Sequence, residues 1–274
     1  MMDETTTTIM AALATFTPSQ LSDLTTSISS DLHLHRRGLS AVLSSPPLFS
    51  LNLHRLHLLS LPAKSLLISK LLLSSLRRLT LHHHHHQATC HSLLKPRDLD
   101  AVLLLLLFCD VSHHTPRALQ TPPFRWREAL AKVYVHSMLT AAGSGIGSPA
   151  AAALVPYIEA TARCMRFVGS TSTSTGRNVN VGGEVVAVVA LPSVGGGVGE
   201  ECVICREEMR EGREVCGLPC QHKFHWRCVL PWLRRRNTCP CCRFRLPTDD
   251  IFAEIQRLWD ILVKMSGVAK AGFI

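Results

Sequence analysis

The sequence predicts a mostly α-helical N-terminal region, then a small module rich in cysteine and histidine, then a C-terminal amphipathic helix. Helix signals recur in a Leu-, Ser- and Ala-rich region, and eight of the eleven cysteines lie between Cys202 and Cys242. An apolar stripe with helical spacing follows these cysteines. The expected parts are a helical region at 1–168, a Gly/Ser/Thr-rich linker at 169–200, the module at 201–245, and a helix and tail at 246–274.

Composition sets limits on the class of protein. A chain of 274 residues that is 46% apolar can bury a core in one or two domains. The formal charge of +9 favours acidic partners but does not choose between nucleic acid, anionic lipid and acidic protein surfaces. Because the cysteines are clustered among histidines, they indicate a metal site and not a disulfide scaffold.

The N-terminal stretch and the most apolar run bear on location. MMDETTTTIMAALATF contains Asp3 and Glu4 and no basic region, which argues against a secretory signal and against a typical transit peptide. We therefore expect a reducing compartment that faces the cytosol. The run from Ala101 to Cys109 is too short for a membrane span of about 20 residues, so we expect no transmembrane segment.

The first predicted helix begins at Pro18, after the N-cap Thr17, with Gln20 as the reciprocal partner of a capping box. Further helices are expected from Pro62, from near Pro96, from Arg125 to Met138, and from Ala150 to Val168, the last kinked or restarted at Pro156. These helices predict a bundle, with the crossing order left open. The apolar positions expected to face its core are Leu21, Leu24, Ile28, Leu32, Leu66, Leu67, Leu71, Leu72, Trp126, Leu130, Val133 and Tyr134.

Two low-complexity segments interrupt this pattern. The run His82 to His86 could bind a transition metal, although a solvated insert is the favoured interpretation and its role is left open. The stretch EVVAVVALP in the linker has the composition of a short strand, and its glycine-rich flanks predict a flexible tether.

The module carries ligand-type residues at regular spacing. Because zinc prefers four tetrahedral thiolate or imidazole ligands, eight candidates predict two closed structural sites. Cys239 and Cys242 have the two-residue spacing of a metal-binding turn, so we expect Cys241 to point elsewhere and Cys216 to be surplus. Pairing Cys239 with Cys241 is sterically poorer, and a backup-ligand role for Cys241 is disfavoured. The eight candidates are Cys202, Cys205, Cys220, His222, His225, Cys228, Cys239 and Cys242.

This order and spacing resemble the RING finger of the RING-H2 type. The intervening residues are similar too: Ile204 precedes the second cysteine, and LPC, FH, PWL and CPCCR stand at matching places. PHD fingers and LIM domains differ in their ligand series. The resemblance covers about 45 residues and implies a cross-braced α+β module with two structural Zn²⁺ ions. In that arrangement Cys202, Cys205, His225 and Cys228 hold one ion, and Cys220, His222, Cys239 and Cys242 hold the other.

The resemblance also implies an activity. RING proteins of this family are E3 ubiquitin ligases, which hold a ubiquitin-charged E2 enzyme so that ubiquitin passes directly to a substrate lysine without a covalent step on the ligase. Ile204, Trp232 and Pro240 match the E2-binding positions, and Arg243 matches a linchpin between E2 and ubiquitin. The alternatives are that Trp232 packs against a zinc loop and that Arg243 is a solvated surface residue.

Two rival functions come from other classes. Arg234, Arg235 and Arg236 suit a zinc-supported nucleic-acid binder, but the module lacks a groove-reading helix and interleaved aromatics, so nucleic acid is not the expected partner. A non-catalytic zinc scaffold is the other alternative, and the E2-binding positions argue against it.

The flanking regions are expected to supply substrate choice and location. After the module, TDDIFAEIQRLWDILVKM predicts a helix with Asp249 and Asp250 at its start and Ile251, Ile255, Leu258, Trp259 and Leu262 on one face. Two N-terminal stretches are IMAALATFTPSQLSDLTTSI and LSAVLSSPPLFSLNLHRLHLLSLPAKSLLISKLLLSSLRRLTL. They resemble the N-terminal half of plant amyloplast-associated RING ligases of shoot gravitropism. That resemblance implies a place on the plastid surface and a role in attaching amyloplasts to actin. The substrate, the E2, the ubiquitin chain type and the oligomeric state are left open.

Overall fold

The chain folds into two compact units in the computed structural model, and each is described by itself. The first contains residues 1–175 and 259–274, and the second contains residues 176–258. The His82 to His86 run and residues 184–190 of the expected strand lie outside the described part of the chain. The structure describes residues 4–80, 94–143, 149–172, 191–197, 199–209, 215–248 and 250–267.

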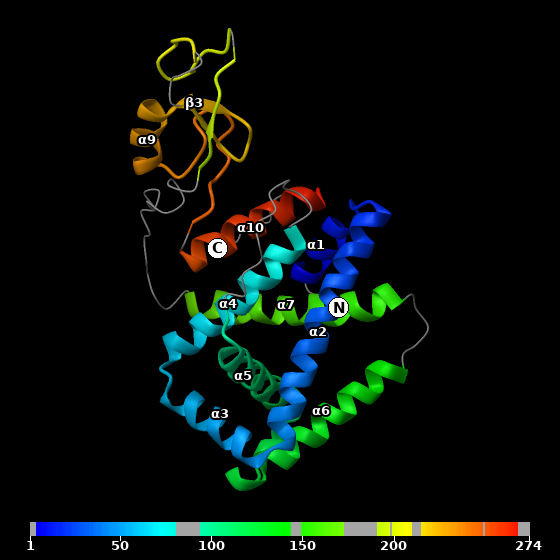
Figure 1. The fold of residues 1–274 in the computed structure, drawn as a ribbon. Helices are drawn as coiled ribbons and strands as arrows, with labels where there is room; N and C mark the ends of the chain where they lie inside the picture. Colours follow the sequence, from blue (N-terminus) through cyan, green and yellow to red (C-terminus); the bar gives the residue numbers. More distant parts are fainter. Residues whose placement is uncertain are drawn as a thin grey trace. The chain divides into compact units, whose positions relative to one another are not determined.

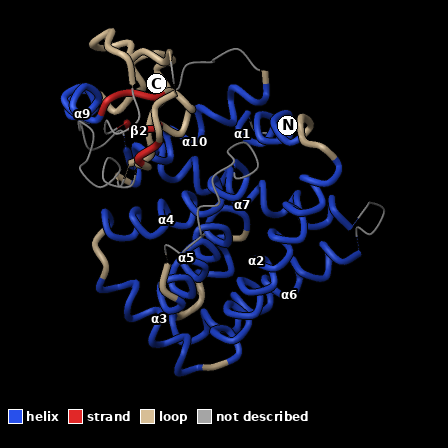
Figure 2. Tube along the Cα trace, turned by 45° about the horizontal axis from the view of Figure 1, so that its top comes forward, coloured by secondary structure: helices blue, strands red, loops and turns tan. Residues whose placement is uncertain are grey.

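The first unit is helical, which confirms the mostly α fold class predicted for the N-terminal region (Figures 1 and 2). Two 3₁₀ turns, Pro116–Leu119 and Pro123–Arg125, connect the fifth and sixth of its helices. Its helices are α1 (Glu4–Leu13), α2 (Pro18–Ser44), α3 (Pro46–Leu58), α4 (Leu61–Thr80), α5 (Pro96–His114), α6 (Trp126–Gly143) and α7 (Pro149–Ser172).

Local signals located several of these helices correctly. The capping box at the start of α2 is present, with the Thr17 hydroxyl accepting from the Gln20 amide and the Gln20 side chain accepting from the Thr17 amide. Helix α5 begins at Pro96 as expected. Of the kink or restart expected at Pro156, the restart is wrong, because α7 runs through this proline as one helix that packs along α2 and α4. Helices α1 and α3, whose patterns are short, were not predicted from the sequence.

Helix α2 holds the first unit together because it contacts α3, α4, α5, α6 and α7. Gly38 marks a close approach to α5: a Cβ there would lie 2.7 Å from Asp100 Oδ1. An ion pair joins α2 to α4, with Arg78 Nη2 donating to Asp31 Oδ1 at 2.7 Å. One core cluster, at the junction of α2, α3, α5 and α6, consists of Leu39, Val42, Leu43, Phe49, Leu56, Ala101, Leu104, Val111 and Leu130.

No single described helix is both long enough and apolar enough to cross a membrane. Helices α3 and α4 reach that length and composition only when taken together, and they meet at a bend of 117°.

The described part of the second unit contains a small antiparallel sheet, the helix α9 (Trp226–Arg235) and the start of a further helix. The strands are β1 (Ser193–Val194), β2 (Val215–Gly217) and β3 (Lys223–His225), in the order β1-β2-β3. Ser193 pairs with Cys216, and Val215 pairs with both Val194 and His225. Helix α10 (Ile251–Ser266) begins in this unit and continues into the first.

The end of the expected linker belongs to this sheet and does not behave as a tether. Strand β1 pairs along β2, and Leu191 and Val194 pack against the core of the module. The Trp226 indole donates to Ser193 Oγ at 3.2 Å. Backbone pairing and apolar burial therefore attach these residues to the module, although the 169–200 stretch has the composition of a linker.

Candidate metal centres and partner-binding residues

Two turns with the same backbone geometry present four of the candidate ligands. In the first, the Cys202 amide donates to the Glu207 carbonyl at 2.9 Å, and the Arg206 amide donates to the Cys202 carbonyl at 2.7 Å. The second turn repeats this pattern 37 positions later. The Cys239 amide donates to the Phe244 carbonyl at 2.8 Å, and the Arg243 amide donates to the Cys239 carbonyl at 3.0 Å. A bridge closes each turn, between Glu201 and Glu208 and between Thr238 and Arg245. Each C-x2-C pair thus lies on a preformed loop.

The β2–β3 hairpin and α9 present the other four candidates. Cys220 and His222 lie in the hairpin turn, where the Leu218 amide donates to the His222 carbonyl at 2.9 Å. His225 ends β3 and is the N-cap residue of α9, so Cys228 falls in the first turn of that helix. The hairpin therefore offers ligands at its tip and at its end.

The structure brings the eight candidates together in two groups. Cys202, Cys205, His225 and Cys228 form one, and within each group the four ligand atoms lie within 4.8 Å of one another. In this first group, Cys205 Sγ lies 3.3 Å from His225 Nδ1. The second group is Cys220, His222, Cys239 and Cys242, with His222 Nδ1 3.4 Å from Cys220 Sγ.

The donor sets fit zinc. Each group offers three thiols and one imidazole, a set that zinc binds with tetrahedral geometry at about 2.0–2.3 Å from each ligand atom. Four protein ligands leave no open position, so an ion here would be structural. Each group joins segments that are far apart in sequence, and a bound ion would cross-link them.

The protein environment alone opposes ionisation of two of these thiols, whereas at Cys202 and Cys242 burial is outweighed by hydrogen bonds, which lower the pKa. Burial, followed by neighbouring thiols, raises the pKa of Cys220 to about 12 and the pKa of Cys228 to about 11. Metal ligands must be thiolates, and a dication is the group that reverses such a shift. A cation bound among these thiols would lower their pKa and so stabilise the clustered thiolates.

The two surplus cysteines lie outside both groups. Cys216 is buried in β2, and burial raises the pKa of its thiol to about 11, so it is a neutral core residue. Cys241 is exposed on the second turn, and desolvation followed by nearby thiols raises its pKa. The geometry agrees with the expectation that Cys241 points elsewhere.

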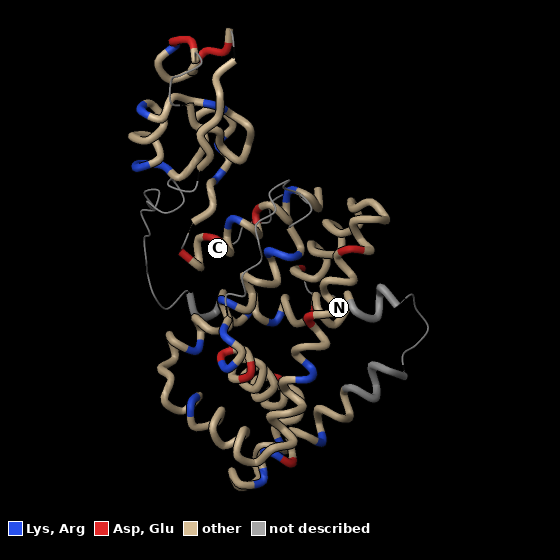
Figure 3. The backbone as a smooth tube through the Cα atoms, viewed as in Figure 1, with Lys and Arg blue, Asp and Glu red and all other residues tan. Residues whose placement is uncertain are grey.

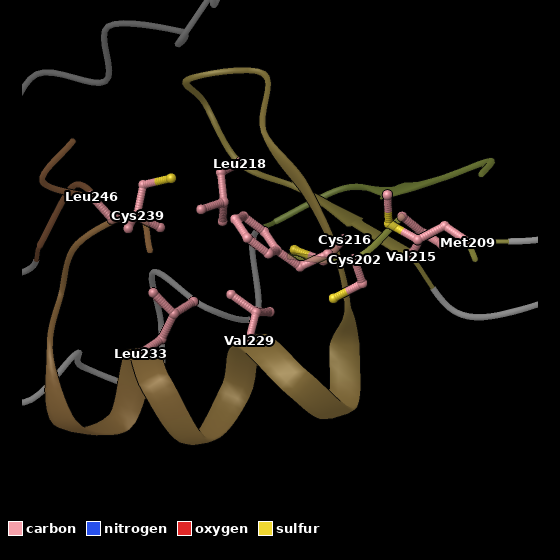
Figure 4. Close-up of a cluster of buried hydrophobic side chains, with 10 residues drawn as sticks. Cys202, Met209, Val215, Cys216, Leu218, Val229, Leu233, Cys239 and Leu246 are labelled. Carbon is pink, nitrogen blue, oxygen red and sulfur yellow. The ribbon is translucent and has the colours of Figure 1, made fainter. Parts of the chain in front are cut away.

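A compact apolar core supports both groups (Figure 4). Val229 and Leu233 project from α9 toward the sheet, and the ligands Cys202 and Cys239 are themselves part of this cluster. Its remaining members are Met209, Val215, Cys216, Leu218, Phe224 and Leu246. The metal sites and the core are therefore one structural unit.

The residues expected to bind E2 lie on both turns and on α9. Ile204, on the first turn, is 40% exposed, and Trp232, on α9, is 38% exposed. The Trp232 indole donates to the Thr238 carbonyl at 2.8 Å, which fixes its orientation next to the second turn. Pro240, on that second turn, is half-buried.

Two features of the module were missed by sequence reasoning. Arg206, Gln221 and Arg243 have φ of 60°, 66° and 58°, and each directly follows a candidate ligand cysteine. A residue in the left-handed conformation closes such a loop. Glycine usually occupies such a position and would have indicated it in the sequence, but none of these three positions is a glycine. Val203, 67% exposed beside Ile204, is a further apolar surface residue of the first turn.

Known proteins are similar to this chain in two ways. The Ring finger domain family model matches residues 200–243, which include all eight candidate ligands. The E3 ubiquitin-protein ligase SGR9, amyloplastic, of Arabidopsis thaliana is 51% identical over 280 residues, covering 97% of this chain and 98% of that protein. The chain belongs to the RING-type E3 ubiquitin-protein ligases. It is therefore a ubiquitin transferase, and this favours the ligase over the scaffold and nucleic-acid alternatives.

Other relatives of this RING-type ligase match over a much shorter stretch of the chain. E3 ubiquitin-protein ligase RING1-like of Arabidopsis thaliana is 52% identical over 50 residues, 18% of this chain and 15% of that protein. E3 ubiquitin-protein ligase RNF181 homolog of Drosophila melanogaster is 47% identical over 58 residues, 21% and 40% of the two chains. No solved structure matches the ligase.

Proposed function

We propose that the ligase binds a ubiquitin-charged E2 through Ile204, Trp232 and Pro240 and directs ubiquitin straight to a substrate lysine. The observation that carries this proposal is the half-exposed Trp232 indole, held at the edge of the second cysteine turn by its bond to Thr238. Trp with a fixed orientation is typical of an interface anchor. Since the module holds the E2 and does not react with it, its contribution is proximity and orientation.

Zinc is the ion that we propose for both groups. Cys202, Cys205, His225 and Cys228 would hold one Zn²⁺, and Cys220, His222, Cys239 and Cys242 the other. Bound zinc supplies a structural cross-link. The chain's own residues then present the E2-binding side chains, because both cysteine turns are parts of the metal sites.

Arg243 is the residue proposed to bridge E2 and ubiquitin. It follows the last ligand, and its left-handed backbone sets the direction in which the side chain leaves the turn. A guanidinium has several donors in a fixed plane, which suits simultaneous bonds to carbonyl oxygens of two proteins.

A lysine-discharge assay tests the E2 proposal. The zinc-loaded chain is mixed with a ubiquitin-charged E2 from a panel and free lysine, and loss of the thioester is followed in time. Ile204→Ala and Trp232→Ala should each slow discharge about tenfold or more, as expected for anchor residues. Phe252→Ala removes an equally exposed apolar side chain (40%) from α10 and should change nothing.

Two outcomes would contradict the proposal. One is full activity of Ile204→Ala and Trp232→Ala with an E2 that the unaltered chain stimulates. The other is equal loss in Phe252→Ala. Two bound zinc ions per chain must be measured for each variant, so that a folding defect is separated from a lost contact.

For location, we propose that the ligase acts on the cytosol-facing surface of amyloplasts, in gravity sensing and in the attachment of amyloplasts to actin. The name of the Arabidopsis relative, amyloplastic, supports the organelle. Residues 32–97 contain nine Lys or Arg and no Asp or Glu, and Figure 3 shows α3 and α4 without acidic positions. This composition suits an anionic membrane surface.

Exposed leucines on α3 and at the start of α4 add apolar surface to this basic segment. Leu48, Leu51, Leu58 and Leu61 are 43%, 62%, 73% and 66% exposed. An amphipathic helix binds a bilayer surface through such side chains together with attraction to anionic lipid. In living plant cells, Leu51→Ser with Leu58→Ser should release the tagged ligase from amyloplasts, while a Phe124→Ser control should not. Retention of the double variant would refute membrane contact by α3.

A further inference from the structure

A pocket with a volume of about 290 Å³ lies in the second unit, on the side of the module where α10 begins. The end of α9 forms one wall, the second cysteine turn another, and the first turns of α10 a third. The residues that carry the argument are Arg235, Arg236, Asn237, Arg245, Thr248 and Arg257. All of them lie within the single compact unit 176–258.

Positive charge dominates the described lining of the pocket, where four arginines and no acidic residue are found. Arg257 is neutralised: its Nε and Nη2 each donate at 2.7 Å to the carboxylate of Glu254, and both side chains are buried. Among the described residues, Arg235, Arg236 and Arg245 form no ion pair. Three guanidinium charges therefore stand around one cavity without a counterion from the described chain.

The two nearby carboxylates already have hydrogen-bond partners within the described chain. Glu254 is occupied by Arg257 and by the Thr248 amide, which donates to its Oε2 at 3.3 Å. Asp250 Oδ1 caps α10 by accepting from the Phe252 and Ala253 amides at 2.9 and 3.1 Å. Arg236 lies 5.9 Å from the centre of the Trp232 ring, a contact that leaves its N–H donors available.

The walls are held in place before any ligand binds. Asn237 Nδ2 donates to the Leu246 carbonyl at 2.9 Å, and the Leu246 amide donates to the Asn237 carbonyl at 3.1 Å. Thr238 and Arg245 form a β-bridge. Among the described residues, Asn237 Oδ1 is buried without a hydrogen-bond partner. Preorganisation of this kind lowers the entropy cost of binding.

We propose that this pocket binds the phosphate group of a phosphomonoester. Planar guanidinium groups form paired bonds to phosphate oxygens, and three of them can neutralise a dianion. A volume near the lower end for ligand pockets fits a phosphate with a small attached group and not a large cofactor. This site adjoins the proposed E2-binding residue Trp232 through Arg236, and phosphate binding there does not depend on ubiquitin transfer.

Calorimetric titration of the full, zinc-loaded chain tests the site, with inorganic phosphate and O-phosphoserine as probes and serine as the uncharged control. Saturable binding at one site per chain is expected for both phosphate probes. Arg235→Gln, Arg236→Gln and Arg245→Gln should each weaken it roughly tenfold, the effect of losing one charge-assisted hydrogen bond. Arg234→Gln is the matched control, because Arg234 is an exposed neighbour on α9 that does not line the pocket.

Equal weakening by Arg234→Gln would overturn the proposal, since it would indicate diffuse surface charge. Absence of saturable binding to both probes would also overturn it. A further arm uses phosphatidylcholine vesicles with and without phosphatidylinositol 4-phosphate. Capture that depends on this lipid and on Arg236 identifies a headgroup as the source, whereas binding of the free probes alone identifies a soluble phosphomonoester. Duplex DNA is the last probe. If it binds more tightly than the phosphate probes and Arg245→Gln does not weaken its binding, the arginines form a nucleic-acid surface and the phosphomonoester pocket is refuted.

Discussion

Three cysteines within four residues have three different environments. Cys239 is a buried member of the second ligand group, Cys242 is an exposed member of the same group, and Cys241 is exposed and belongs to neither group. A turn closes between the Cys239 carbonyl and the Arg243 amide. It brings Cys239 and Cys242 together and leaves Cys241 on the outside. At the scale of single residues, backbone geometry thus separates chemically identical side chains.

Cys242→Ser and Cys241→Ser should therefore differ sharply. Loss of the ligand should reduce bound zinc from two ions per chain and unfold the module, because structural zinc contributes on the order of 10 kcal/mol to such domains. Loss of the exposed thiol should keep both ions and change stability by about 0.5 kcal/mol or less. Metal content by mass spectrometry and thermal melting check this. A zinc loss in Cys241→Ser would make it a ligand.

Arg206 and Arg243 offer a matched pair for the linchpin. Both follow the last cysteine of a C-x2-C turn, with φ of 60° and 58°, so alanine should strain both turns similarly. Arg243→Ala should slow ubiquitin discharge by roughly 10-fold or more, the effect of losing bonds to charged donors. Arg206→Ala should retain activity. Similar rates for the two variants would count against a bridging role for Arg243.

His35 on α2 gives the first unit a pH dependence. Burial first, and the nearby Arg78 charge second, lower its pKa from the ordinary value of 6.5. The unfolded chain therefore binds more protons below pH 6.5, so the stability present above that pH is lost as pH falls toward the lowered pKa. Asp31 also faces Arg78, and burial raises its pKa from the ordinary value of 3.8. Because the folded chain then binds more protons than the unfolded chain, the contribution of Asp31 to stability rises as pH falls, and it does so at lower pH than the contribution of His35.

Melting of the chain between pH 7.5 and 5.5 checks this sign. The melting temperature of the helical unit should fall with pH, and His35→Gln should reduce the slope. His33→Gln, which alters an exposed histidine of the same helix, is the control and should leave the slope unchanged. A slope that is identical in the chain and in His35→Gln would show that the protonation of His35 does not control this stability.

At the scale of elements, strand β1 extends the metal module on its N-terminal side. The chain passes so close to the first cysteine turn that a Cβ on Gly196 would lie 1.7 Å from the Met209 carbonyl oxygen. Glycine is required here by contact with a backbone atom that cannot rotate away. Gly195, one position earlier, would meet nothing within 4 Å.

Gly196→Ala should therefore destabilise the module by about 1–3 kcal/mol, the usual cost of overpacking, because the segment that carries β1 must move. Gly195→Ala adds the same methyl group and should lower the free energy of unfolding much less. Thermal or denaturant unfolding monitored by Trp226 fluorescence compares the two, since its indole bonds to β1. Equal stability of both variants would mean that β1 is not held against the module.

At the scale of the whole molecule, the two units should respond differently to metal removal. Among the described residues, both metal-type groups lie between Cys202 and Cys242, and the core of the helical unit is built from apolar side chains. A strong chelator should unfold the module and abolish ubiquitin transfer, while most of the helical signal remains. Circular dichroism with and without added zinc measures this. Collapse of the helical signal on chelation would indicate that the helical unit depends on the module.

Ligand order, helix caps and family membership could be predicted from the sequence because each depends on local spacing. Eight Cys and His residues at characteristic intervals predict two zinc sites, and Thr17, Pro18 and Gln20 predict the start of α2. The same residues predict no packing partner for these segments. Helix α3, whose pattern is short, and the left-handed arginines, which lack a glycine marker, therefore escaped detection.

The tertiary structure alone decided which distant segments meet. The pairing of β1 with β2, the approach of Gly196 to Met209 and the cavity that gathers Arg235, Arg236 and Arg245 all join residues with no local signal in common. Such contacts depend on how apolar surfaces pack in three dimensions, which spacing along the chain does not encode. The sequence by itself determined that this chain carries a RING-type ligase module with two sets of candidate metal ligands, attached to helices. The tertiary structure decided that the linker ends as strand β1 of the module. It also decided that Arg235, Arg236 and Arg245 line one pocket.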